Sequence, residues 1–174
     1  KVIATDLDGT LFYPKHRFRM ISPSYVKFLR NHIDNGGRVI IVSGRNHESA
    51  RKVELKIGRP VDFVCCNSAY VRTNGNVIRD AGISTKTIKI VEELKKKFDV
   101  KGQTLMSEEY PLIIEAGNLG WFFSVFAKIY YFFQGVYAED YFVADSTLIN
   151  EQLKKGKTYK LMLFFGFGRR GKES

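Results

Sequence analysis

Two carboxylates stand two positions apart directly after a short apolar run. Residues 2–5 are typical of a buried parallel strand, and Asp6 and Asp8 follow it, with Gly9 and Thr10 in a predicted turn. In open α/β sheets, ligands bind beyond the carboxyl ends of such strands. One carboxylate there can attack phosphorus, and the other can transfer protons. Gly9 lets the backbone approach a phosphate, and the N–H groups of the turn can receive its charge. The alternative interpretation is a solvated Asx turn.

A second polar constellation follows the next apolar run, residues 39–42. Ser43 and Gly44 stand where this predicted strand ends and a helix begins, and Arg45 comes next. A serine hydroxyl and a backbone N–H in this position can both donate hydrogen bonds to a phosphate, and an arginine adds positive charge. The alternative is a Ser-Gly turn with Arg45 on the helix surface. Because both constellations follow strand ends, we favour one phosphate site formed by the two together.

The elements that must position these residues alternate between strands and helices. Ser22 and Pro23 are typical of a helix start, and Asn67 and Ser68 follow the third strand. The predicted order is strand 2–5, helix 22–35, strand 39–42, helix 48–57 and strand 61–66. This alternation predicts an α/β fold, with a partial Rossmann-like parallel sheet formed by residues 1–82.

The pattern changes in the second half of the chain. Asn74-Gly75 predicts a hairpin within residues 70–78. Further along, we predict a helix at 84–98, paired strands at 103–106 and 112–115, a helix at 119–133, a strand at 141–144, a helix at 146–154 and a strand at 159–165. We interpret residues 83–165 as an α+β module of antiparallel strands and helices, and residues 166–174 as a flexible tail.

Composition limits the classes of protein and of partner. The 174 residues are 44% hydrophobic and 26% charged, which is ordinary for a globular protein and excludes a disordered or fibrous chain. The net charge of +10 suits an anionic partner, either nucleic acid or small phosphorylated molecules. The two cysteines are adjacent, which excludes a disulfide framework and favours a reducing compartment such as the cytoplasm. The longest apolar stretch is too short to span a membrane.

The sequence resembles the haloacid dehalogenase-like phosphohydrolases. Members of that family carry an apolar strand followed by DxDGT and a second apolar strand followed by (S/T)G, as residues 2–10 and 39–44 do here. The Cof-type sugar-phosphate phosphatases are the most similar subgroup. Their second motif commonly reads (S/T)GR, they follow the third strand with an Asn-rich turn and a hairpin, and they insert a large cap domain.

This resemblance implies a role for each motif residue. Asp6 would be the nucleophile and a Mg²⁺ ligand, and Asp8 would be the general acid/base and offer its backbone carbonyl to the metal. Ser43 would hold the phosphate, and Arg45 and Asn67 would contact phosphate or substrate. The implied function is Mg²⁺-dependent hydrolysis of small phosphorylated metabolites, sugar phosphates in particular, through an aspartyl-phosphate intermediate.

The chain departs from the family pattern beyond the predicted cap. The family has a third motif with a lysine and a fourth, Gly-Asp-x-x-x-Asp, and neither is found here. We therefore expect a fragment of a longer enzyme or a truncated copy, with weak Mg²⁺ binding and an exposed sheet edge. The alternative function is a catalytically impaired binding module for anionic ligands or nucleic acid. Nucleic acid is the less favoured partner because no motif for binding it is present.

Overall fold

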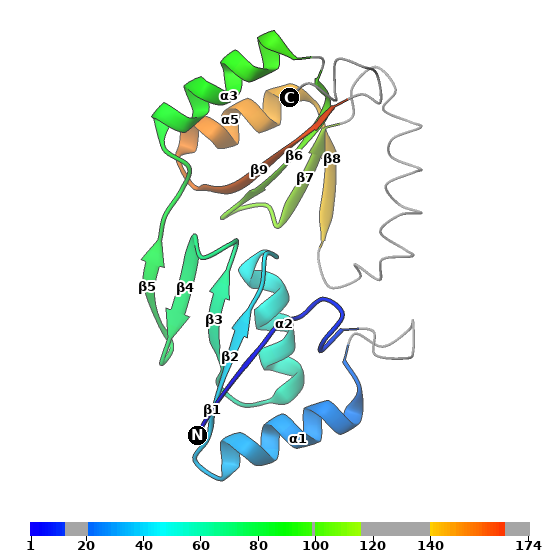
Figure 1. Ribbon diagram of the computed structural model, residues 1–174, viewed down its shortest axis with the longest axis vertical. Coiled ribbons are helices and arrows are strands. Elements are labelled where there is room, and N and C mark those ends of the chain that lie inside the picture. Colours follow the sequence, from blue (N-terminus) through cyan, green and yellow to red (C-terminus); the bar gives the residue numbers. More distant parts are fainter. Residues whose placement is uncertain (13–20, 99, 116–139, 166–174) are drawn as a thin grey trace. The chain divides into compact units, whose positions relative to one another are not determined.

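The computed structural model describes residues 1–12, 21–98, 100–115 and 140–165, which form two compact units. The first unit is Lys1–Asp80, and the second begins at Ala81. Each unit has its own sheet (Figure 1). Among the described helices, none has the length and apolar character needed to cross a membrane.

The first unit contains a five-stranded sheet in the order β1-β2-β3-β4-β5. Its strands are β1 (Val2–Thr5), β2 (Arg38–Val42), β3 (Asp62–Cys65), β4 (Tyr70–Thr73) and β5 (Asn76–Asp80). The first three strands are parallel, and β4 and β5 form the predicted hairpin, antiparallel to β3 and to each other. The α/β class with a parallel core is confirmed. Within the described residues β1 is an edge strand, and Val2 is 59% exposed.

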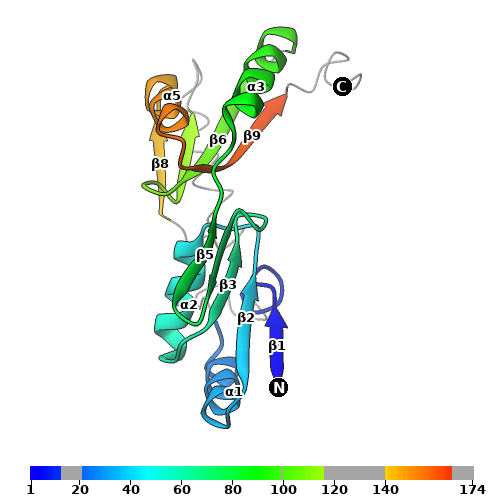
Figure 2. The same ribbon diagram turned by 90° about the vertical axis from the view of Figure 1, so that its left-hand side faces the viewer.

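Two helices cover one face of this sheet (Figure 2). Helix α1 (Pro23–Asp34) begins after Ser22, whose side chain accepts a hydrogen bond from the Tyr25 N–H. Helix α2 (His47–Ile57) begins after Asn46, which caps it in the same way, and ends at Gly58 in a left-handed conformation. These local capping signals explain why the sequence predicts both helices closely.

The core of the first unit lies between these helices and the sheet. Leu29 of α1 and Val53 of α2 are buried, as are Val39 and Ile41 of β2. Alternation along β2 leaves Val42 exposed on the opposite face. The parallel strands are therefore covered on one face by α1 and α2, and their carboxyl ends point to a common edge.

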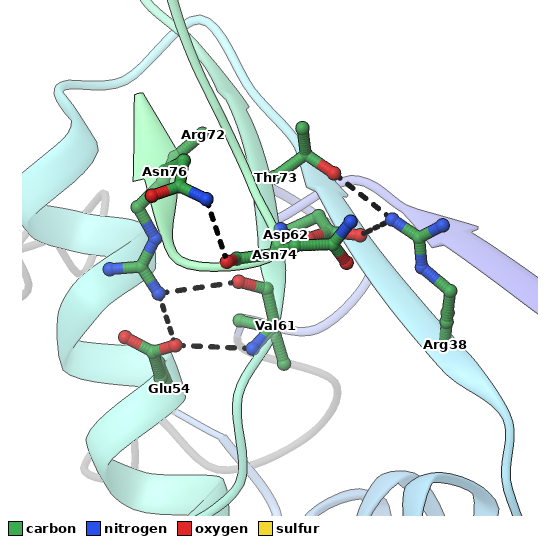
Figure 3. Close-up of polar contacts among 8 residues, drawn as sticks. All are labelled: Arg38, Glu54, Val61, Asp62, Arg72, Thr73, Asn74 and Asn76. Carbon is green, nitrogen blue, oxygen red and sulfur yellow. Dashed lines mark hydrogen bonds and ion pairs between the residues drawn. The ribbon is translucent and has the colours of Figure 1, made fainter. Parts of the chain in front are cut away.

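A polar network lies at the opposite, amino-terminal end of the parallel strands (Figure 3). Glu54 of α2 accepts a hydrogen bond from the Val61 N–H at 3.1 Å and pairs with Arg72 of β4. The Arg72 guanidinium also lies 4.2 Å from the centre of the Phe63 ring. This network adds polar links between α2, the start of β3 and β4.

Asp62, the first residue of β3, is the centre of a neighbouring set of contacts in Figure 3. Its carboxylate accepts hydrogen bonds from Arg38 at 2.5 Å and from the Asn74 N–H at 2.8 Å. Burial raises the pKa of this carboxyl, but the bonds from Asn74 and Arg38 lower it more, so that its pKa lies below the ordinary 3.8. The charged form of Asp62 thus links the β4–β5 turn to β2 and β3.

The lowered pKa of Asp62 predicts an acid-sensitive contribution to stability. Because its pKa is lower in the folded than in the unfolded state, the contribution is complete above the ordinary value and is lost as pH falls through the lowered one. We expect Asp62→Asn to reduce the free energy of unfolding by about 1–2 kcal/mol at pH 7 and by less in acid. Urea denaturation at pH 7 and pH 3 measures this difference. Asp145→Asn, which keeps a helix-capping acceptor, is the control. An equal loss of unfolding free energy in Asp62→Asn at both pH values would contradict the prediction.

The second unit contains a four-stranded sheet in the order β8-β7-β6-β9, with two helices on one face. Its elements are α3 (Thr85–Lys97), β6 (Val100–Ser107), β7 (Leu112–Glu115), β8 (Tyr141–Ala144), α5 (Ser146–Lys155) and β9 (Thr158–Phe165). Its buried core is formed by Leu105, Ile113, Ile149 and Leu153, and Ile88 of α3 packs against it. The predicted helix at 119–133 and the predicted tail at 166–174 lie outside the described residues.

The second sheet differs from the prediction in one pairing. Strand β6 is antiparallel to β7 and β9, as expected, but β7 and β8 are parallel, with Leu112 opposite Tyr141. The expectation of antiparallel strands is therefore wrong for the pair β7 and β8. Parallel neighbours need a crossover of about a dozen residues or more, and residues 116–140 supply that length. The pattern of apolar residues along a strand does not show whether that strand pairs parallel or antiparallel with its neighbour.

Candidate active site

The carboxyl ends of the three parallel strands meet at one cleft of about 310 Å³. Pairing of Thr5 with Ile41 and of Val42 with Val64 places these strand ends level with one another. The described residues that line the cleft are Asp6, Val42, Ser43, Gly44, Val64, Asn67 and Ser68. The structure thus brings together four of the predicted site residues, contributed by three separate segments of the chain.

Asp6 lines this cleft immediately after β1 and is exposed. Its Oδ1 accepts a hydrogen bond from the Leu7 N–H at 2.7 Å, and Leu7 itself is completely buried. The buried leucine fixes the backbone, while the bond orients the carboxylate. A carboxylate has about four acceptor positions, so one bond leaves it capacity for a cation or for attack on a substrate.

Ser43 is buried at the end of β2, and its backbone N–H extends the ladder by donating to the Val64 carbonyl at 2.9 Å. Its Oγ accepts a hydrogen bond from the Arg45 N–H at 3.2 Å. A hydroxyl that accepts through oxygen still has its own O–H to donate. Ser43 can therefore donate a hydrogen bond to an anion in the cleft.

Asp8 and Arg45 lie together, and neither is among the described residues that line the cleft. The Arg45 Nε donates to both carboxylate oxygens of Asp8, at 3.0 and 2.9 Å, and Nη2 donates to Oδ1 at 2.6 Å. Gly9 has a positive φ of +71°, which explains the glycine in this turn, and Thr10 is exposed. Gly9 and Thr10 also lie outside the cleft lining. The family resemblance implies that Arg45 contacts phosphate or substrate, whereas in the structure its guanidinium is hydrogen-bonded to Asp8.

The turn after β3 adopts an unusual backbone conformation. Cys66, Asn67 and Ser68 have φ angles of 53°, 55° and 71°, so that three successive non-glycine residues are left-handed. Such a conformation costs about 1–2 kcal/mol per residue, with asparagine the most tolerant. A bond from the Cys66 N–H to the Arg45 carbonyl, at 2.9 Å, ties the turn to the end of β2. Backbone strain of this kind concentrates at functional sites.

Ser68 is a cleft residue that was not among the predicted site residues. Asn67 signals a turn, but a serine in a left-handed conformation has no sequence signature of its own. Val42 and Val64 also line the cleft because side chains alternate along strands, so the two paired valines lie on the same face of the sheet.

The strain at Ser68 predicts an order of stability among its variants. We expect Ser68→Gly to be more stable than Ser68→Ala by about 1 kcal/mol, because only glycine adopts this conformation without strain. Chemical denaturation of the two variants measures the difference. The same pair at Ser24, within α1, should show the reverse order because glycine weakens a helix. Equal stability of the two Ser68 variants would contradict a left-handed turn.

The described residues contain no group of three or more histidine, cysteine or acidic side chains that could hold a metal ion. Mg²⁺, however, is usually bound through one or two carboxylates together with waters and substrate phosphate. Asp6 supplies one carboxylate to the cleft, which Ser43 also lines. This donor set fits a cation whose remaining ligands include the phosphate of a substrate.

The chain belongs to the haloacid dehalogenase-like hydrolase family, whose sequence model matches residues 3–166. The resemblance seen in the motifs is thereby confirmed. The curated relatives include pyridoxal phosphate phosphatase YbhA of Escherichia coli, which is 35% identical over 71 residues. That match covers 41% of this chain and 25% of the relative.

Solved structures share the fold of this chain. A haloacid dehalogenase-/Cof-like hydrolase from Plasmodium vivax has a TM-score of 0.67 at 23% identity, covering 95% of this chain and 56% of that one. A subclass IIB sugar phosphatase has a TM-score of 0.62 at 19% identity, covering 94% of this chain and 58% of that one. The chain thus spans less than two thirds of the length of the proteins that it matches.

Proposed function

We propose that the protein is a Mg²⁺-dependent phosphatase that hydrolyses small phosphorylated metabolites, sugar phosphates in particular, through an aspartyl-phosphate intermediate. The observation that carries this proposal is the cleft shared by Asp6, Ser43 and Asn67 at the ends of three parallel strands. A nucleophile, a hydroxyl donor and an amide there surround a space that suits a phosphoryl group. Membership of a hydrolase family, one relative named a phosphatase and one structural neighbour named a sugar phosphatase agree with it.

In the first half of the proposed reaction, a carboxylate oxygen of Asp6 attacks phosphorus as the bond from phosphorus to the ester oxygen breaks. Asp8 gives its proton to the departing oxygen, and Ser43 donates a hydrogen bond to a phosphoryl oxygen. In the second half, Asp8 takes a proton from water as that water attacks the phosphorus of the acyl-phosphate. Inorganic phosphate leaves, and the Asp6 carboxylate is regenerated.

Asp6, together with the Asp8 carbonyl, would hold Mg²⁺, which when bound reduces the repulsion between a carboxylate and a phosphate dianion. The net charge of +10 would attract anionic substrates over longer distances. We further propose that residues 83–165 form a cap that selects the substrate, since they contain an independent sheet and core. The buried cysteine thiols suit a reducing cytoplasm.

The test is hydrolysis by the purified full-length protein of p-nitrophenyl phosphate and a panel of sugar phosphates. We expect turnover with Mg²⁺, loss of turnover in EDTA and recovery when excess Mg²⁺ is added, because one carboxylate holds the cation only weakly. Turnover that is unchanged in EDTA would contradict the metal requirement. No turnover together with salt-sensitive binding of nucleic acid would favour the impaired binding module instead.

A further inference from the structure

We propose that Arg45 is a positioning residue for Asp8. Its guanidinium holds the Asp8 carboxylate in one orientation, two residues after the cleft residue Asp6, and it does not bind the substrate phosphate. The inference rests on the proposed function, because that function gives Asp8 its role in proton transfer. It differs from the expectation that the arginine of an (S/T)GR motif contacts phosphate or substrate.

The contacts between the two side chains engage both carboxylate oxygens. Oδ1 of Asp8 accepts from Nε at 3.0 Å and from Nη2 at 2.6 Å, while Oδ2 accepts from Nε at 2.9 Å. A planar guanidinium that contacts both oxygens prevents the carboxylate from rotating. Of these three bonds Oδ2 receives one and Oδ1 receives two.

Arg45 is the fixed member of this pair. Its side chain is 10% exposed, whereas that of Asp8 is 52% exposed. The Arg45 backbone is held on both sides, because its N–H donates to Ser43 Oγ at 3.2 Å and its carbonyl accepts from the Cys66 N–H at 2.9 Å. Its guanidinium carbon also lies 5.4 Å from the centre of the buried Phe12 ring. An exposed aspartate is thus held by a buried arginine whose backbone N–H is hydrogen-bonded to Ser43, a residue of the cleft.

This arrangement has a chemical consequence for the proposed acid step. A proton donor accelerates the reaction only when it is aimed at the departing oxygen, and free rotation of an exposed carboxylate reduces the time spent in that orientation. The loss of Arg45 should therefore matter most for esters whose alcohol is a poor leaving group. A phenolate such as p-nitrophenolate leaves with little protonation and should need Asp8 less.

The experiment compares Arg45→Met with the unaltered full-length protein on a hexose phosphate and on p-nitrophenyl phosphate. We expect kcat/KM for the hexose phosphate to fall by about 10–100-fold and that for p-nitrophenyl phosphate by less than about 3-fold. The inhibition constant of inorganic phosphate should stay within about 2-fold, because a positioning residue does not hold phosphate. Arg51→Met, at an exposed arginine of the following helix α2, is the control and should change neither value.

A double-mutant cycle distinguishes a positioning role of Arg45 from a non-specific loss of activity. In an Asp8→Asn background, Arg45→Met should reduce kcat/KM by no more than about 2-fold, since the group that Arg45 positions has already lost its proton-transfer function. Equal losses on both substrates with a raised inhibition constant would assign Arg45 to phosphate and overturn the inference. If Arg45→Met lowers kcat/KM in the Asp8→Asn background as much as it does in the unaltered protein, the inference is also overturned.

Arg45→Lys covers the case in which the methionine variant does not fold. Lysine keeps the charge but lacks the planar fork, so the selective loss on the hexose phosphate should persist. The proposed function is tested separately by Asp6→Asn. If Asp6→Asn retains activity, the proposed function fails; if it abolishes activity while Arg45→Lys affects both esters equally, only the inference fails.

Discussion

Replacing Asp6 by asparagine is expected to abolish phosphate-ester hydrolysis, lowering kcat by at least about 1,000-fold. The amide oxygen of asparagine is a poor nucleophile, and the residue would no longer bring a negative charge to the cleft. The fold should persist, since the asparagine Oδ1 can still accept the hydrogen bond from the Leu7 N–H. Steady-state turnover of p-nitrophenyl phosphate with Mg²⁺ measures the loss, and circular dichroism checks the fold.

Asp34→Asn is the matched control for this experiment. Asp34 lies at the end of α1 in an exposed pair with Arg59, and the same chemical change there should leave turnover unchanged. Rapid acid quenching followed by mass spectrometry should detect a phosphoryl group on the unaltered protein and none on Asp6→Asn. Retained turnover in Asp6→Asn, or a phosphoryl group attached at another residue, would show that Asp6 is not the nucleophile.

Replacing Glu54 by alanine is expected to lower the free energy of unfolding by about 2–4 kcal/mol. Glu54 accepts from the Val61 N–H and pairs with Arg72, and the side chains of Glu54 and Arg72 are only 18% and 20% exposed. Its removal leaves the Val61 N–H without this acceptor and leaves the partly buried Arg72 guanidinium with a long bond to the Val61 carbonyl, at 3.4 Å, in place of a carboxylate. Since Arg72 lies over the Phe63 ring, the guanidinium cannot reach solvent without losing that contact.

The Glu54 prediction is measured by urea denaturation at pH 7. Glu48→Ala, the same substitution in the same helix but at a more exposed pair with Arg51, should cost about 0.5–1 kcal/mol. The loss of unfolding free energy in Glu54→Gln should lie between these two values, because glutamine keeps an acceptor for the Val61 N–H but carries no charge. If Glu54→Ala costs no more than Glu48→Ala, the network does not stabilise the first unit.

The positions of the chemical groups along the chain could be predicted from the sequence. Asp6 and Ser43 each follow an apolar run, and a parallel strand that ends in polar residues places those residues at the carboxyl edge of a sheet. The capping signals at Ser22 and Asn46 and the left-handed Gly58 determine where helices begin and end. These features are local, because each depends on residues within one or two turns of the chain.

The sequence by itself therefore determined the strand–turn motifs, the helices α1 and α2 and the family of this protein, and the tertiary structure decided which distant groups meet. Arg45 pairs with Asp8, 37 positions away, and Glu54 pairs with Arg72, 18 positions away. The parallel pairing of β7 with β8 and the left-handed turn at Ser68 were likewise settled by the structure alone. The physical reason is that long-range partners follow from strand register and packing, which sequence periodicity does not encode.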